Sequence, residues 1–425
     1  MAVTAGSVTE TVEAAFRIES PRIIAAVTRV VRDVGIAEEI AQDALVAALE
    51  QWPESGVPDR PGAWLTATAR HRAVDLVRRK ETYARKLAEV GRAMEDVRPA
   101  GAEDPAEVLD AADAGGGIDD DLLRLIFTAC HPVLPTQARI ALTLRLLGGL
   151  TTPEIARAFL TSEPAVAQRI VRAKRSLATA GVPFEVPRGP ERDARLSSVL
   201  EVIYLIFNEG YSATSGDDWV RPGLCEDALR LARVLESLMP GEGEVHGLAA
   251  LLEFQASRVP ARTGPSGEAV LLADQNRARW NRMLMRRGVD ALHRAGRGPY
   301  SLQAAIAACH AQAVRYEETD WTTIAALYGR LVELTRSPVV ELNRAVAVSM
   351  AHGPTEGLAI VDGIADEPAL KNYHLLPSVR GDLLERLGRT DEARAEFERA
   401  ASLAGNAREK ELLLARAAGS APGGA

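Results

Sequence analysis

A strongly acidic segment divides this chain of 425 residues and limits what it can fold into. Between Leu87 and Asp121 there are eleven acidic residues and two arginines, so the segment carries a net charge of −9. It also contains three consecutive glycines from position 115 and few large apolar side chains. A segment of this composition buries too little apolar surface to offset the entropy lost on ordering. The sequence therefore predicts a flexible tether between two folded parts.

The charge of the rest of the chain differs from the total. The whole chain has 50 basic and 58 acidic residues, a net charge of −8, so the residues outside the acidic segment sum to about +1. Seven lysines and arginines lie between Arg70 and Lys86, directly before that segment. Overall acidity therefore does not exclude a surface that binds nucleic acid.

The composition favours an all-α fold. The chain is rich in Ala, Leu, Arg and Glu, which lose little on entering a helix, and only 4% of its residues are aromatic. It has no apolar run long enough to span a membrane and no secretion signal at its amino terminus. Three widely separated cysteines do not form a disulfide framework. We expect a reduced, cytoplasmic protein that does not enter a membrane.

Helical periodicity and proline- and glycine-rich breaks predict several domains. Three folded parts, separated by two linkers, account for almost the whole chain. In order these are a helical domain at 1–86, an acidic linker at 87–118, a second helical domain at 119–180, a short linker at 181–191, an all-helical extension at 192–416 and a disordered tail at 417–425.

The most specific motif is a predicted helix-turn-helix between Leu150 and Leu177. Thr152 and Ser162 are expected to cap its two helices, each with a proline close behind. No acidic residue occurs from Pro164 to Phe184, and one face of the second helix is polar and basic. That face consists of Ala165, Gln168, Arg169 and Arg172. It suits the major groove of DNA, although an αα-hairpin with solvated arginines remains an alternative.

Two further helices carry charged faces. The helix predicted from Pro61 to Lys80 combines outward-facing arginines with Trp52 in the loop before it. Basic residues interleaved with exposed aromatic rings suit melted single-stranded nucleic acid. Trp64 is interpreted as a core residue. The helix from Ala37 to Glu50 has an acidic face, which is either simply solvated or docks a basic partner helix.

A repeat with a period of 35 residues occurs near the carboxyl terminus. The segment that begins at Gly353 recurs at Gly388, and each copy lies between two helices with apolar periodicity. A helix–turn–helix unit with a period near 34 is typical of tetratricopeptide repeats. The extension is therefore predicted to be a helical-repeat domain.

These motifs resemble a known family. Residues 37–43 (Ala-Glu-Glu-Ile-Ala-Gln-Asp) and the motif Trp64-Leu65 … Ala69-Arg70-His71 … Asp75-Leu76 … Arg78-Arg79 resemble region two of extracytoplasmic-function (ECF) sigma factors. The helix from Ala165 to Leu177 resembles their region four. The segments at 121–132 and 207–212 resemble recurring segments of a subgroup with a tetratricopeptide-like extension.

The resemblance implies an alternative sigma factor, which binds core RNA polymerase and directs it to promoters through the −10 and −35 elements, without catalysis or a cofactor. Its partners would be promoter DNA, the β′ clamp helices and β subunit of polymerase, and a protein or peptide bound by the extension. The implied polymerase contacts are Glu39, Gln42 and Asp43. The implied −10 contacts are Trp52, Arg60, Arg70, His71, Arg78 and Arg79. The implied −35 contacts are Ser162, Ala165, Gln168, Arg169, Arg172 and Lys174.

Other interpretations remain open at this stage. A helix-turn-helix regulator with a ligand- or protein-sensing repeat domain is the alternative function. Cys130-His131 and Cys309-His310 lack neighbouring ligands, so we predict no metal site, and no enzyme motif occurs. An arginine cluster at 277–287 either touches DNA or is solvated. The segment Asn208 to Tyr211 either borders a pocket or forms a capped turn.

Overall fold

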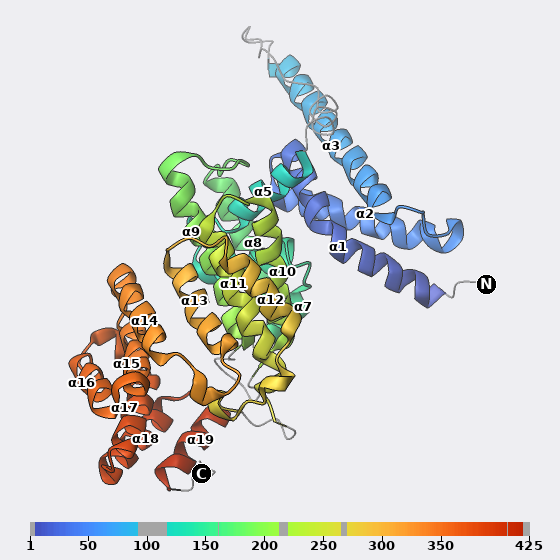
Figure 1. Cartoon of the computed structure of the whole chain (residues 1–425). Coiled ribbons are helices and arrows are strands. Elements are labelled where there is room, and N and C mark those ends of the chain that lie inside the picture. The colour runs from blue at the N-terminus through green and yellow to red at the C-terminus, as the bar shows by residue number, and fades with distance from the viewer. Residues whose placement is uncertain are drawn as a thin grey trace. The chain divides into compact units, whose positions relative to one another are not determined.

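The computed structural model describes residues 5–91, 117–159, 161–211, 220–264, 270–405 and 407–419. In this part of the chain the regular elements are α-helices and short 3₁₀ turns, without a β-strand, which confirms the predicted all-α fold (Figure 1). None of the helices among these residues combines the length and apolarity needed to cross a bilayer. The chain forms two compact units, 1–202 and 203–425, and each is described by itself.

The first three helices form an amino-terminal module. They are α1 (Ala5–Val31), α2 (Val34–Ser55) and α3 (Pro61–Gly91), and α1 packs against both of the others. Asp33 caps α2, because its carboxylate accepts hydrogen bonds from the N–H groups of Gly35 and Ile36 at 2.7 and 3.0 Å. Ile23 and Leu65 are fully buried between the helices.

The helices on either side extend into the acidic segment that the sequence predicts to be a tether. α3 continues to Gly91, and α5 (Gly117–Ala129) begins within the acidic segment. Asp121 is buried and pairs with Arg124 at 2.5 Å and with Arg29 of α1 at 3.6 Å, so it belongs to the folded part. Burial raises the pKa of the Asp121 carboxyl, and the two arginines oppose that rise. The tether residues 92–116 lie outside the described residues.

The second module contains the helix-turn-helix. Its helices are α5, α6 (Thr136–Leu146), α7 (Thr152–Ala158) and α8 (Glu163–Thr179). The cap of α7 is Thr151 rather than the predicted Thr152, and it forms a reciprocal capping box with Glu154. This choice places Pro153 in the first helical turn, where its missing N–H has no cost. Ser162 occupies the cap position of α8, but its side chain makes no capping hydrogen bond.

Helix α9 (Gly189–Tyr211) is divided between the two units. Its first half packs on the second module through buried polar contacts. Arg195 donates to the carbonyl oxygen of Phe127 at 3.0 Å, and Ser198 donates to that of Cys130 at 2.6 Å. The predicted extension from 192 therefore begins with residues that complete the core of the second module.

The second unit is a series of helix pairs, α10 to α19, in which most helices pack on the next along the chain. The bounds are α10 (Pro222–Leu238), α11 (Gly243–Arg258), α12 (Arg282–Leu292), α13 (Pro299–Gln312), α14 (Trp321–Thr335), α15 (Pro338–His352), α16 (Pro354–Gly363), α17 (Leu375–Arg386), α18 (Thr390–Leu403) and α19 (Ala407–Ala417). The two predicted repeat copies are the pairs α15–α16 and α17–α18. Their turns place Gly353 at φ +108° and Gly388 at φ +75°, which side chains rarely adopt.

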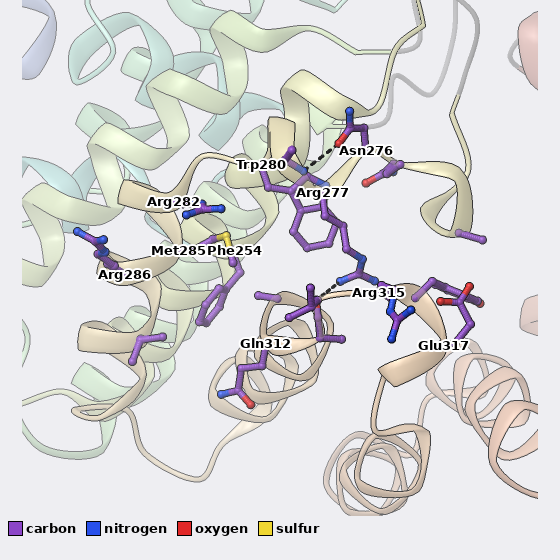
Figure 2. Close-up of a pocket in the computed structure, with 18 of the residues that line it drawn as sticks. Phe254, Asn276, Arg277, Trp280, Arg282, Met285, Arg286, Gln312, Arg315 and Glu317 are labelled. Carbon is purple, nitrogen blue, oxygen red and sulfur yellow. Dashed lines mark hydrogen bonds between the residues drawn. The ribbon is translucent and has the colours of Figure 1, made fainter.

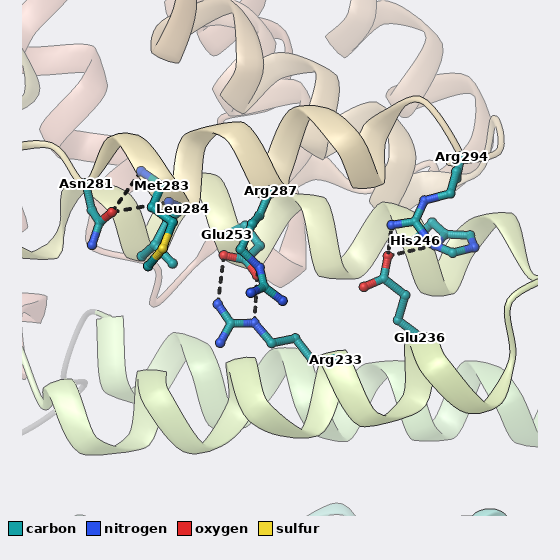
Figure 3. Close-up of polar contacts among 9 residues, drawn as sticks. All are labelled: Arg233, Glu236, His246, Glu253, Asn281, Met283, Leu284, Arg287 and Arg294. Atoms are coloured by element: carbon teal, nitrogen blue, oxygen red, sulfur yellow. Dashed lines mark hydrogen bonds and ion pairs between the residues drawn. The ribbon is translucent and has the colours of Figure 1, made fainter.

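Buried ion pairs hold α10, α11 and α12 together. Glu253 of α11 is 2% exposed and accepts hydrogen bonds from Arg233 of α10 at 2.8 and 3.0 Å, while Arg287 of α12 approaches it at 3.2 Å (Figure 3). The same two helices are joined by a second contact, in which Glu236 of α10 lies 2.8 Å from His246 of α11. A buried carboxylate is tolerated because cations from both neighbouring helices surround it.

Candidate nucleic-acid interface

Helix α8 presents the face that the sequence predicts for DNA reading. Its opposite face is buried through Val166, Ile170, Ala173 and Leu177. On the outer side Ser162, Gln168 and Arg172 are exposed, while Ala165 and Arg169 are half-buried. The helix can therefore keep its apolar stripe on the module while its exposed face lies in a groove.

Lys174 is held within the protein instead of pointing to solvent. Its ammonium group pairs with the buried carboxylate of Glu38 on α2. In this conformation it is not available for the phosphate contact that the resemblance implies.

The exposed face of α8 also includes two residues that the sequence analysis did not select. Val171 is 54% exposed and Arg175 is exposed, and together with Gln168 and Arg172 they follow the i, i+3, i+4, i+7 spacing of one face. This spacing was readable from the sequence. An exposed valine methyl can meet the methyl group of thymine, and an arginine can meet a phosphate.

Most of the predicted −10 contacts lie on one exposed surface of α3. Arg60, which immediately precedes α3, and His71, Arg78 and Arg79 are exposed. Arg70 is half-buried. Because α3 runs unbroken from Pro61 to Gly91, His71, Arg78 and Arg79 lie along a single helix.

Trp52 does not lie in the predicted loop. Helix α2 continues through Pro53 to Ser55, which leaves 56–60 as the connection. Trp52 is 1% exposed, and its ring packs edge-on against Trp64 with 5.4 Å between centroids. The large apolar area of two indoles and their edge-to-face contact explain why the helix extends over this residue. The side chain is therefore not free to stack on a base in this conformation.

An exposed aromatic residue does occur on α3, at a position that the sequence analysis did not select. Tyr83 is 67% exposed and lies between the exposed basic residues Arg79, Lys80, Arg85 and Lys86. An aromatic side chain inside a basic run was the signal that could have identified it. This is the combination that single-stranded nucleic acid prefers.

The acidic face of α2 is exposed as predicted. Glu39 and Asp43 are exposed, with Val46 at 50% exposure between them and Glu50. Asp43 approaches Arg72 of α3 at 3.5 Å, an exposed pair of little energetic weight. Gln42 is half-buried and donates to Glu38 at 3.0 Å, so it points along the helix toward the core.

Glu38 connects the two modules of the first unit. Its carboxylate accepts a hydrogen bond from Arg145 of α6 at 2.6 Å and pairs with Lys174 of α8. A second, exposed connection joins Arg17 of α1 to Glu154 of α7 at 2.8 Å. The helix-turn-helix is thus fastened to the amino-terminal module by charge pairs on both of its helices.

The arginine cluster at 277–287 belongs to a pocket in the second unit. Arg277 donates to the carbonyl oxygens of His310 and Ala313 at 2.5 and 2.8 Å and stacks on Trp280, while Arg286 extends at the rim of a cavity of about 870 Å³ (Figure 2). The guanidinium group of Arg277 is thus engaged in contacts within the protein. The cluster is therefore not a single flat face that would follow a DNA backbone.

Among the described residues, no cluster of three ligating side chains surrounds either Cys-His pair. Cys130 is buried, and its sulfur lies 3.3 Å from the hydroxyl of Thr143. Burial raises the pKa of the Cys130 thiol to about 11, so it is an unreactive core group.

The fold and its surfaces define a class of protein: a helix-turn-helix DNA reader joined to a helical module with an acidic face and a basic face. Comparison with known protein families supports this class. Residues 15–83 match sigma-70 region 2, residues 124–177 match sigma-70 region 4, and residues 195–296 match a family of unknown function.

Relatives are found for both parts of the chain. An uncharacterized protein of Rhizobium meliloti is 44% identical over 397 residues, which cover 92% of each chain. The ECF RNA polymerase sigma factor SigK of Mycobacterium ulcerans is 32% identical over 160 residues, covering 37% of this chain and 78% of SigK. SigK of Mycobacterium tuberculosis is 32% identical over 162 residues, with the same coverage. No solved structure matches the chain.

This chain belongs to the ECF RNA polymerase sigma factors. It is an alternative sigma factor, which directs RNA polymerase to promoters, and it carries a large carboxy-terminal extension.

The burial of Trp52 makes a prediction about stability. Trp52→Ala should lower the free energy of unfolding by about 3–5 kcal/mol, because it removes a fully packed indole from the core. Tyr83→Ala, at an exposed position, should change it by less than about 0.5 kcal/mol. Urea denaturation followed by circular dichroism measures both. A Trp52→Ala protein of normal stability that opens promoters poorly would instead support the base-stacking role.

Proposed function

We propose that α8 reads the −35 element and that α3 binds the −10 element during promoter opening. The observation that carries the proposal is the exposed face of α8, where Gln168, Val171 and Arg172 project from a helix that contains no acidic residue after its first turn. A guanidinium that projects from the exposed face of a recognition helix suits bidentate contact with guanine. The chain itself is proposed to catalyse no reaction.

Along α3 the proposed −10 contacts are His71, Arg78 and Arg79, with Arg60 at the start of the helix and Tyr83 as the stacking residue. Tyr83 takes the part that the sequence analysis assigned to Trp52, because its ring is exposed and that of Trp52 is buried. Stacking on an exposed ring stabilises an unpaired base by about 1–3 kcal/mol.

The acidic face of α2 is the proposed docking surface for the β′ clamp helices of polymerase. Glu39 and Asp43 are the exposed carboxylates of this face, and Val46 supplies an apolar contact between charged residues. Gln42 is proposed to act from the edge of the same face. Such a surface fits a partner helix that carries basic residues around an apolar stripe.

Replacement of Arg172 tests the −35 assignment. Arg172→Ala should weaken binding to the cognate −35 element by about 1–3 kcal/mol and binding to a scrambled element much less. Arg188→Ala, which removes an exposed arginine outside α8, is the matched control and should have no effect. Fluorescence anisotropy with both DNA sequences measures the difference. Equal losses on the two sequences would reassign Arg172 to a phosphate.

Charge reversal on α2 tests polymerase docking. Glu39→Lys should slow association with core RNA polymerase and weaken the complex severalfold, because exposed charges act mainly through electrostatic steering. Glu185→Lys makes the same charge change at an exposed position outside α2. Surface plasmon resonance at two salt concentrations separates the effects. If both variants bind alike, the acidic face is merely solvated.

The extension is proposed to control access of the helix-turn-helix to the −35 element or to polymerase, in response to a protein or peptide partner. Support comes from α9, whose first half is bound to α5 and whose second half belongs to the extension. Helix α9 runs without a break from the first unit into the second, which supports coupling between them.

Truncation after Tyr211 tests this control. The shortened chain keeps Arg195 and Ser198, which complete the second module, so its DNA-reading surface should remain folded. We expect promoter-dependent run-off transcription to change severalfold relative to the full chain. Truncation after 191 is the contrasting variant and should destabilise the second module. Equal transcription, promoter affinity and polymerase affinity for 1–211 and the full chain would contradict the regulatory role.

A further inference from the structure

A second cavity in the unit 203–425 is smaller and more enclosed than the one in Figure 2. It has a volume of about 340 Å³ and is bounded by α9, α11, α13, α14 and α15. Leu251, Ile306 and Leu331 contribute apolar walls. The volume lies in the range of sites for small organic molecules. The segment Asn208 to Tyr211 borders it, which answers the alternative left open by the sequence: this segment lies at a pocket edge.

The cavity wall includes Arg258, whose guanidinium group has no counter-charge among the described residues. Arg258 is half-buried, and its hydrogen bonds go to the amide oxygens of Gln255 and Gln275, both long at 3.4 Å. Among the described residues no carboxylate pairs with it. A cation removed from water without an opposite charge is costly, which makes the site receptive to an anion.

The surroundings of Arg258 add to this positive charge. Arg262 stacks on Tyr211 at 3.7 Å, and Arg277 stacks on Trp280, the ring that also faces Arg258 at 5.3 Å. Burial lowers the pKa of Arg258, and both neighbouring arginines lower it further. These neighbours repel a cation in the cavity and attract an anion.

Two polar atoms of the cavity wall are buried without a hydrogen-bond partner in the described part of the chain. They are the hydroxyl of Tyr211 and Nδ1 of His310. Buried groups of this kind each cost about 1–3 kcal/mol unless something bonds to them. Burial, helped by Arg258 and Arg277, lowers the pKa of His310 to about 4, so its ring is neutral at pH 7 and can donate or accept.

We propose that this cavity binds a small organic anion, whose carboxylate or phosphate group pairs with Arg258 while its apolar body lies against Ile306 and Leu331. Tyr211 and His310 complete the anion's hydrogen bonds. None of the residues of this site belongs to the proposed DNA or polymerase surfaces, so binding of the anion does not depend on those assignments. Through this site a small molecule can act on the extension, in addition to the proposed protein partner.

Benzoate and phenyl phosphate are suitable probes, because each combines one acidic group with an apolar ring, and benzyl alcohol is the neutral control. Isothermal titration of the full-length chain should show saturable binding of at least one anion with a stoichiometry of one, and no comparable binding of the alcohol. The tighter anion distinguishes a carboxylate site from a phosphate site.

Variants locate the binding in this cavity. Arg258→Gln should weaken anion binding at least about tenfold, whereas Arg330→Gln, at an exposed arginine of the same unit, should leave it unchanged. Tyr211→Phe keeps the ring that Arg262 and Phe207 contact and should weaken binding severalfold, even if Arg258→Gln proves unstable. The proposal is overturned if neither anion binds saturably at millimolar concentration. That result is expected if an acidic side chain of the protein itself neutralises Arg258. It is also overturned if the variants bind like the native chain.

Discussion

The buried carboxylate of Glu38 is a charge that joins the two modules of the first unit. A carboxylate that is 5% exposed must be paired, and here both partners, Arg145 and Lys174, come from the second module. Removal of the charge of Arg145 or Lys174 would therefore leave part of this buried carboxylate uncompensated. The same pairing occupies Lys174, which reduces the cations that the recognition helix can offer to DNA in this conformation. One side chain thus contributes both to the joining of the two modules and to the composition of the proposed −35 surface.

The proposed interfaces differ in how they use charge. On α8 and α3 the basic residues stand on the outer face of helices whose inner faces are fully apolar, so cations can meet phosphates without any change in packing. On α2 the order is reversed, and an acidic face surrounds the exposed Val46. One small module thereby carries both a basic face, proposed for nucleic acid, and an acidic face, proposed for polymerase.

The extension has a different internal chemistry. Its ion pairs around Glu253 are compensated, whereas Arg258, less than two turns further along α11, has no acidic partner among the described residues. This contrast within one helix distinguishes a structural charge from one that is kept for a ligand. Helix α9 contributes Tyr211 to the cavity and Arg195 to the second module, so the same helix carries residues of both units.

The sequence by itself determined the all-α class, the helix-turn-helix, the family and most of the exposed charged positions. Helical periodicity, capping residues and breakers are local, and they act within one or two turns. Tertiary packing decided the features that the sequence analysis missed. Trp52 appeared to be a loop residue because Pro53 follows it, but its contact with Trp64 favours the helix and buries it.

Lys174 and Asp121 illustrate the same limit for charged residues. Lys174 shares its helix with the arginines proposed to contact DNA, and Asp121 ends an acidic run, so their local sequence suggests exposure to solvent. Glu38 and Arg29, which are far away in the sequence, bring them into the protein interior. Pairing between distant charges depends on how the helices assemble, and the pattern within a single helix does not contain that information.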